Sequence, residues 1–232
     1  MFEKGRIASL LKIDVGLEQA VHGAQLMQPI PDLAQTLRWA RSLGVIGTKM
    51  RSLIHDTTQG MVVEAVRQQF ALAEEIFAAG LLPIVEIEVS TALPDDVRRI
   101  QELQLRTSIA SALEQASEDL RIFLKLTIPV TAGLYTPLMR HAKVYRVLAL
   151  SGGFSRHYAC QQLAQNPGMI ASFSRALLED LRAQMPEAEF NRMLDRSMFE
   201  VLGATKNRKD LTEQGSFVQE RLADSYSGVI DE

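Results

Sequence analysis

Short apolar runs alternate with longer amphipathic stretches along the chain, and this alternation constrains the fold more than any other feature of the sequence. Strands that alternate with helices are typical of a parallel sheet covered by helices. A (β/α)8 barrel has roughly 31 residues per unit, and successive runs here begin 23 to 39 residues apart. We therefore predict an α/β chain of the TIM-barrel type with only about six βα units present, and an open six-stranded parallel sheet is the alternative. The runs cover residues 10–16, 45–53, 82–89, 121–129, 144–153 and 169–175.

The stretches between these runs are predicted to be helices. In residues 59–79 apolar side chains recur at helical spacing, and Gly80 follows as a terminator. We see no internal domain boundary, so residues 1–204 are predicted to form a single partial barrel domain, and the polar residues 205–232 a tail. The other predicted helices cover residues 33–43, 94–120 and 176–202.

Charge and cysteine content exclude several classes of protein. The 232 residues include 25 Lys and Arg against 28 Asp and Glu, so no global positive field favours nucleic acid. No stretch reaches the 18 consecutive apolar residues that a membrane-spanning helix needs, and the first residues do not resemble a signal peptide. The single cysteine, Cys160, excludes an internal disulfide, and the four histidines share no metal-binding spacing. We expect a cytoplasmic protein that needs no metal and no cofactor.

Ionisable side chains occupy one face of four successive apolar runs. Residues two apart in a strand point to the same side, and helices are expected to cover the other side. The charged face should therefore point into the barrel near its open end, where ions are costly unless they are paired. Such a cost suggests a functional site, although pairs at exposed strand ends would be a purely structural explanation. The residues concerned are Lys12 with Asp14, Lys49 with Arg51, Glu86 with Glu88, and Lys125.

Lys125 is the hardest of these residues to explain structurally, because lysine is almost never buried without a partner or a purpose. Desolvation and nearby cations disfavour an ammonium ion in an apolar strand. The neutral amine attacks a ketone to form a Schiff base, and the protonated imine stabilises the carbanion left when a carbon–carbon bond breaks. Glu86 is expected to move protons during these steps.

A phosphate site is predicted where the last two runs end. Ser151, Gly152 and Gly153 stand where a strand becomes a loop, and glycine lets backbone N–H groups approach an anion. Arg175, at the end of the next run, could supply a guanidinium. The last two loops of such barrels frequently bind phosphate.

Seven ordered segments identify a family that the chain resembles: LLKIDVGL, GAQLMQPI, GTKMRS, LLPIVEIEV, FLKLTIP, LALSGGFSR and IASFSRAL. From about residue 3 to residue 207 the chain resembles the class I fructose-bisphosphate aldolases, particularly their bacterial branch. The resemblance implies a metal-independent Schiff-base lyase of glycolysis and gluconeogenesis. Such an enzyme cleaves fructose 1,6-bisphosphate reversibly into dihydroxyacetone phosphate and glyceraldehyde 3-phosphate.

The resemblance also implies a role for each candidate residue. Lys125 matches the Schiff-base lysine, Glu86 the proton acceptor and Glu88 the second, supporting glutamate. Lys49 and Arg51 match cations near the reacting carbons and the second phosphate. The remaining substrate and phosphate contacts match Lys12, Ser151, Gly152 and Arg175.

The sequence departs from the family pattern at its start and in two motifs. Two further βα units begin the family's barrel, and the first carries an aspartate, so the chain is expected to be N-terminally truncated. The family's E-P-E is Glu86-Ile87-Glu88 here, and its D-K-G is Asp14-Val15-Gly16. The alternatives are an impaired aldolase-like protein that only binds phosphate ligands, and another Schiff-base barrel such as a transaldolase-like enzyme. Open sheet edges would also favour self-association.

Overall fold

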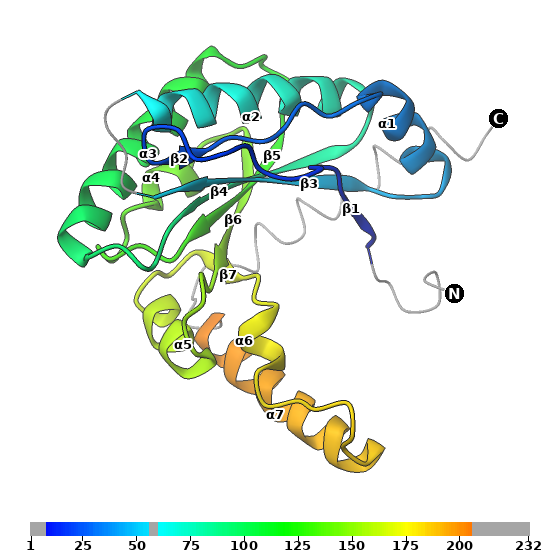
Figure 1. Ribbon diagram of the computed structural model, residues 1–232, viewed down its shortest axis with the longest axis vertical. Helices are drawn as coiled ribbons and strands as arrows, with labels where there is room; N and C mark the ends of the chain where they lie inside the picture. The colour runs from blue at the N-terminus through cyan, green and yellow to red at the C-terminus, as the bar shows by residue number, and fades with distance from the viewer. Residues whose placement is uncertain (1–7, 56–59, 206–232) are drawn as a thin grey trace.

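A single sheet of parallel strands organises the computed structural model, which describes residues 8–55 and 60–205 (Figure 1). Six of the seven strands of the sheet follow the order β1-β3-β4-β5-β6-β7, and each neighbouring pair along this path is parallel. The short β2 pairs antiparallel with the end of β3, beyond β1. The strands are β1 (Leu10–Lys12), β2 (Ala24–Gln25), β3 (Gly47–Ile54), β4 (Leu82–Val89), β5 (Ile122–Thr127), β6 (Val144–Leu150) and β7 (Met169–Ala171).

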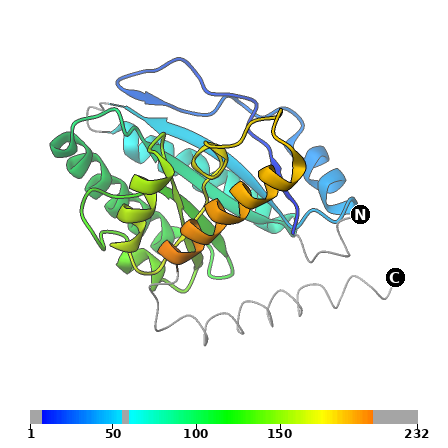
Figure 2. The ribbon, with the colours of Figure 1, turned by 90° about the horizontal axis from the view of Figure 1, so that it is seen from below.

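Helices form two groups around this sheet. Figure 1 shows α2 and α3 side by side along one face, while α5, α6 and α7 gather beyond β7. Seen from below in Figure 2, α7 is the long orange helix next to α5 and α6. No described helix is long and apolar enough to span a bilayer. The helices are α1 (Leu33–Ser42), α2 (Met61–Ala78), α3 (Asp95–Gln115), α4 (Thr136–Met139), α5 (Arg156–Ala164), α6 (Arg175–Leu178) and α7 (Glu187–Thr205).

The core lies between the sheet and α2 and α3. Every residue of β4 is buried, as expected for a central strand covered on both faces. On α2 the predicted apolar face is the buried one, and it includes Val66 and Phe70. The amide of Gln69 crosses from α2 to the sheet, donating to the Ser52 hydroxyl at 2.9 Å and to the Glu86 carbonyl at 2.6 Å. This helix therefore fixes β3 and β4 relative to each other.

All six predicted runs contain a strand, and the α/β class is confirmed. Four strands, β1, β5, β6 and β7, end before their runs do, so that Asp14, Ser151 and Arg175 lie beyond β1, β6 and β7, whereas β3 and β4 reach the ends of their runs. The described strands form an open sheet and not a closed barrel. The stretch 176–202, predicted to be helical with one interruption at Pro186, coincides with α6 and α7, which are separated by residues 179–186, so the interruption is longer than predicted.

Three short elements were not predicted from the sequence: β2, α4 and α5. The predicted tail lies outside the described residues from 206 onward, and its first residue, Thr205, ends α7. The assignment of residues 1–204 to a single domain stays a prediction.

Candidate active site

Strand register brings the predicted charges together on the sheet face opposite α2. Arg51 pairs with Glu86, and Glu86 pairs with Lys125, so three neighbouring strands place these residues in one row. Lys12 pairs with Lys49 in the row before it. Ser52 faces α2. Lys49 and Arg51 lie an odd number of residues before it on β3, so their side chains point to the other side of the sheet. The side chains of the folded strands therefore alternate between the two faces of the sheet as the sequence predicted.

The carboxylate of Glu86 lies between two ammonium groups. Its Oε1 is 3.3 Å from the Lys125 Nζ, and its Oε2 is 3.0 Å from the Lys49 Nζ. The Glu86 side chain is 6% exposed and that of Lys125 is 15% exposed, so the contacts are largely protected from water. Lys125 is thus held beside a single carboxylate that can exchange a proton with it.

The same charge chain continues toward β1. Asp14 Oδ2 is 3.8 Å from the Lys49 Nζ, and Asp14 Oδ1 is 2.7 Å from the Lys12 Nζ. The Lys12 ammonium also donates to the Asp14 carbonyl oxygen at 2.9 Å. Positive and negative groups therefore alternate from Lys12 to Lys125, which lowers the cost of placing five ions together.

Arg51 and Glu88 form a separate pair next to this chain. The Nε and one terminal nitrogen of Arg51 both lie 2.8 Å from Glu88 Oε2. The pair is partly buried, and it fixes the guanidinium in a defined direction. Glu88 thus positions the cation that is expected to meet a phosphate.

A cavity of about 410 Å³ opens at the carboxyl ends of the strands and contains most of the predicted site. Seven of the nine candidate residues line it: Arg51, Glu86, Glu88, Lys125, Ser151, Gly152 and Arg175. Lys49 adjoins it through its contact with Glu86. Lys12 does not line the cavity and belongs to the site only through Asp14.

The turn after β6 forms one wall of the cavity. Gly152 has φ +61°, a conformation that favours glycine, and its carbonyl accepts a hydrogen bond from the Thr91 hydroxyl at 2.6 Å. A Cβ on Gly152 would overlap the Thr91 methyl group, so this position is closed to a side chain. The glycine predicted from the sequence to approach an anion is therefore also required by the packing of two loops.

Several residues of the site were not selected from the sequence. Ser172 and Ser174 line the cavity on the loop after β7, and Leu150 lines it at the end of β6. Two serines at a spacing of two next to Arg175 were the available signal. Asp14 was noted as a partner of Lys12 but not selected as a site residue, although it links Lys12 to Lys49.

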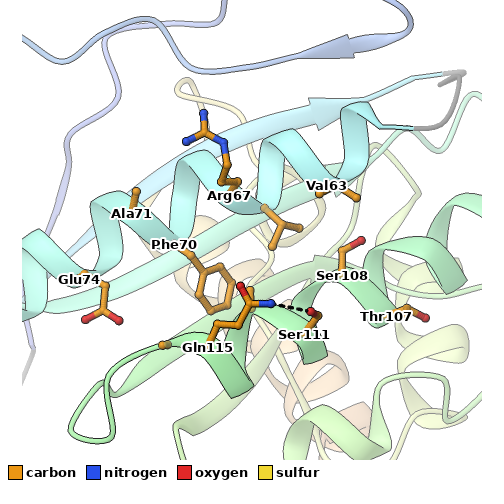
Figure 3. A pocket seen from close by; sticks show the side chains of 12 residues that line it. Val63, Arg67, Phe70, Ala71, Glu74, Thr107, Ser108, Ser111 and Gln115 are labelled. Atoms are coloured by element: carbon orange, nitrogen blue, oxygen red, sulfur yellow. Dashed lines mark hydrogen bonds between the residues drawn. The ribbon is translucent and has the colours of Figure 1, made fainter.

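A larger cavity, of about 580 Å³, lies elsewhere and has a different character. It is a groove between α2 and α3 on the outer side of the sheet (Figure 3). Phe70 points into it from α2, and Gln115 of α3 donates to the Ser111 hydroxyl at 3.1 Å. Its two charged residues, Arg67 and Glu74, face no cluster of opposite groups within it. Volume alone therefore does not identify the reactive site.

Metal ligands are also not gathered at either cavity. Among the described residues, no three His, Cys, Asp or Glu side chains are placed to hold a metal ion. Cys160 is a free thiol on the buried face of α5, and desolvation raises its pKa to about 11.

Similar proteins point to one kind of enzyme. The chain is 43% identical to the class 1 fructose-bisphosphate aldolase of Synechocystis sp. over 205 residues, which cover 88% of this chain and 68% of that protein. The class 1 fructose-bisphosphate aldolases of Porphyromonas gingivalis and Clostridium acetobutylicum are 40% and 39% identical over the same length. The chain thus spans about two thirds of the length of these relatives.

Structural comparison agrees at the level of the fold. Fructose-bisphosphate aldolase from Plasmodium falciparum, solved in complex with TRAP and a small-molecule inhibitor, matches with a TM-score of 0.70. The match covers 89% of this chain and 71% of that chain at 18% identity, and its fold is a TIM barrel. No family model matches the sequence.

Proposed function

The chain belongs to the class I fructose-bisphosphate aldolase family, and from this premise we propose that it cleaves fructose 1,6-bisphosphate by a Schiff-base mechanism. The products would be dihydroxyacetone phosphate and glyceraldehyde 3-phosphate, and the reaction is reversible. The observation that carries the proposal is the Lys125 Nζ, 3.3 Å from the Glu86 carboxylate, in a cavity shared with Ser151, Gly152 and Arg175.

The proposed reaction begins at the amine of Lys125. The uncharged nitrogen attacks the C2 ketone of the open-chain sugar bisphosphate and forms a carbinolamine. Glu86 accepts a proton from the ammonium and returns one to the carbinolamine hydroxyl, which leaves as water. The protonated imine accepts the electron pair of the C3–C4 bond as that bond breaks, and the C4 hydroxyl gives its proton to the Glu86 carboxylate, which later returns it at C3. Protonation of the resulting enamine at C3 and hydrolysis release dihydroxyacetone phosphate and the free lysine.

The two phosphates of the substrate need cationic and N–H donors at separate points. We assign one phosphate to the backbone of Ser151 and Gly152 together with Arg175, all of which line the cavity. The second phosphate is assigned to Arg51, held by Glu88, and to Lys12 at the end of the charge chain. Lys49 is assigned to stabilise negative charge near the reacting carbons, because it already neutralises Glu86 beside Lys125.

Two other functions are less well supported. A protein that only binds phosphates would have no use for a buried carboxylate between two lysines, and the relatives named above are all aldolases. Those same names give no support to a transaldolase-like activity.

Borohydride trapping tests the proposal directly. Reduction of the protein with dihydroxyacetone phosphate present should attach the triose phosphate covalently to Lys125, as read by peptide mass spectrometry. Lys125→Arg is the matched control, because it keeps a cation beside Glu86 but offers no amine that can form an imine. A folded wild-type protein that stays unlabelled, or that is labelled at Lys49 instead, would reject the proposal.

The cellular location of the protein and its self-association are also proposals. We place it in the cytoplasm, where sugar phosphates are metabolised. We further propose self-association, because the path of described strands ends at β1 and β7, and open strand edges favour pairing with another chain. A monodisperse monomer in light scattering would contradict the second statement.

A further inference from the structure

Arg98 and Glu102 form a buried ion pair near the start of α3, outside the cavity of the proposed site. Their side chains are 4% and 0% exposed, and the Arg98 Nη2 lies 2.8 Å from Glu102 Oε1. Opposite charges four residues apart on a helix are usually a surface pair. A buried pair is costly unless its other polar atoms also find partners, so those partners show what the pair holds in place.

One set of partners lies on the loop after β5. Glu102 Oε2 accepts a hydrogen bond from the Val130 backbone N–H at 2.8 Å, and Arg98 Nη2 donates to the Ile128 carbonyl at 2.8 Å. Ile128 is three residues beyond Lys125 on the same strand and loop. The pair therefore fixes the segment that immediately follows the proposed Schiff-base lysine.

The other partner lies on the turn after β6. The Arg98 guanidinium carbon is 5.5 Å from the centre of the Phe154 ring, within the range of a cation–π contact. The Phe154 N–H donates to the Ser151 carbonyl at 2.9 Å and closes the turn that contains Gly152. One guanidinium thus contacts both the loop beyond Lys125 and the turn assigned to a phosphate.

The surroundings of the pair are dry, which makes these contacts strong. Desolvation raises the pKa of Glu102 despite the nearby Arg98. Tyr135 is fully buried beside it, and burial first, then the Glu102 charge, raise the pKa of its hydroxyl well above the usual value. Arg98 Nε is buried and makes no hydrogen bond within the described residues, so the hold of the pair on the two loops depends on Arg98 Nη2, Glu102 Oε2 and the ring contact.

We propose that Arg98 and Glu102 are positioning residues that hold the Schiff-base lysine and the phosphate turn in a fixed relative position. This inference rests on the proposed function. Apart from their contact with each other, Glu102 bonds the loop after β5 and Arg98 reaches both that loop and Phe154, which belongs to the turn after β6. The three residues should therefore have three different effects.

The test measures the rate of borohydride-trapped imine formation against the concentration of dihydroxyacetone phosphate. Glu102→Gln should lower the maximum rate about tenfold or more and leave the half-saturating concentration unchanged. Phe154→Leu should raise the half-saturating concentration and leave the maximum rate unchanged. Arg98→Met should change both, and Arg98→Lys should recover only part of each loss, because an ammonium cannot reproduce the fork of a guanidinium.

Lys143→Met is the matched structural control. Its ammonium also joins α3 to the sheet, through hydrogen bonds of 2.7 Å to the Leu113 and Ala116 carbonyls, but at the start of β6 and away from the cavity. This variant should lose stability and keep the rate and half-saturation of the wild type.

Failure of the inference can be separated from failure of the proposed function. A labelled wild-type protein, with folded Glu102→Gln and Arg98→Lys variants that keep its rate and half-saturation, would overturn the positioning role alone. Variants that contain less active protein, but whose active fraction keeps the maximum rate and the half-saturating concentration of the wild type, would overturn it as well. An unlabelled wild-type protein would reject the proposed function and, with it, this role.

Discussion

Two networks of charged side chains in this molecule have opposite designs. The network at the cavity alternates three lysines with two carboxylates, from Lys12 through Asp14, Lys49 and Glu86 to Lys125. Two of its buried oxygens, Asp14 Oδ2 and Glu86 Oε2, make no hydrogen bond within the described part of the chain and have only ion-pair contacts. Cations are in excess, and hydrogen-bonding capacity remains for a ligand.

The second network surrounds Arg156 and is closed. Its guanidinium meets Glu200 at 2.8 Å, Asp180, and Glu179 at 3.8 Å, and the Arg156 backbone N–H donates to Glu179 at 2.9 Å. Hydrogen bonds from Arg156 lower the pKa of Asp180 and of Glu200. Burial opposes the charge on Arg156, but the hydrogen bonds that it donates to these carboxylates raise its pKa above the usual range. Here anions are in excess, and the contacts join α5, α6 and α7.

The difference suggests a rule for reading such clusters. A network that is satisfied by its own members stabilises the fold, whereas one that leaves buried acceptors unbonded beside a cavity is prepared for a ligand or a proton. Three measurements can test this distinction between the two networks.

The largest expected difference is in the cleavage rate, when one glutamate in each network is replaced by glutamine. Glu86→Gln removes the group proposed to move protons at Lys125, and the rate of fructose 1,6-bisphosphate cleavage should fall about 10²- to 10⁴-fold. Glu200→Gln makes an equal change beside Arg156 and should leave that rate unchanged. Release of glyceraldehyde 3-phosphate measures both. Equal rates for the two variants would remove the functional distinction between the networks.

Removal of the Arg156 guanidinium should affect stability instead. Arg156→Met leaves three carboxylates without their common partner, and the free energy of unfolding should fall by about 1–3 kcal/mol. That range lies below the cost of a fully buried pair because the carboxylates are partly exposed. Urea unfolding at neutral pH measures the loss, and Arg156→Lys should recover part of it. A variant as stable as the wild type would show that the closed network contributes nothing.

The sequence predicted the cavity network far better than the Arg156 network, for a physical reason. Lys49, Glu86 and Lys125 lie in strands whose period of two places side chains on one face whatever the exact ends of the strands. Parallel register then aligns the rows, and Arg51, Glu86 and Lys125 become neighbours. The Schiff-base role itself came from the resemblance to a family and stays a proposal.

Other features depend on tertiary structure that no local pattern encodes. The helix α5 was missed because a charged residue, Arg156, is among its buried residues, so its inner face does not show a continuous apolar pattern. Arg98 and Glu102 have the spacing of a surface pair, and only the loops after β5 and β6 bury them. The two-residue β2 is too short for any alternation to appear.

The pH dependence of stability should give the smallest and most specific difference. Because Arg156 lowers the pKa of Asp180 and Glu200 in the folded protein, the unfolded chain binds more protons between the folded and unfolded values. Their contribution is therefore complete above the unfolded pKa values, about 4, and is lost as the pH falls through the lowered values. Between about pH 5 and pH 3 the wild type should lose more stability in urea unfolding than Arg156→Met does. Parallel losses in the two proteins would mean that the carboxylates do not titrate against Arg156, and that the second network is not closed in solution.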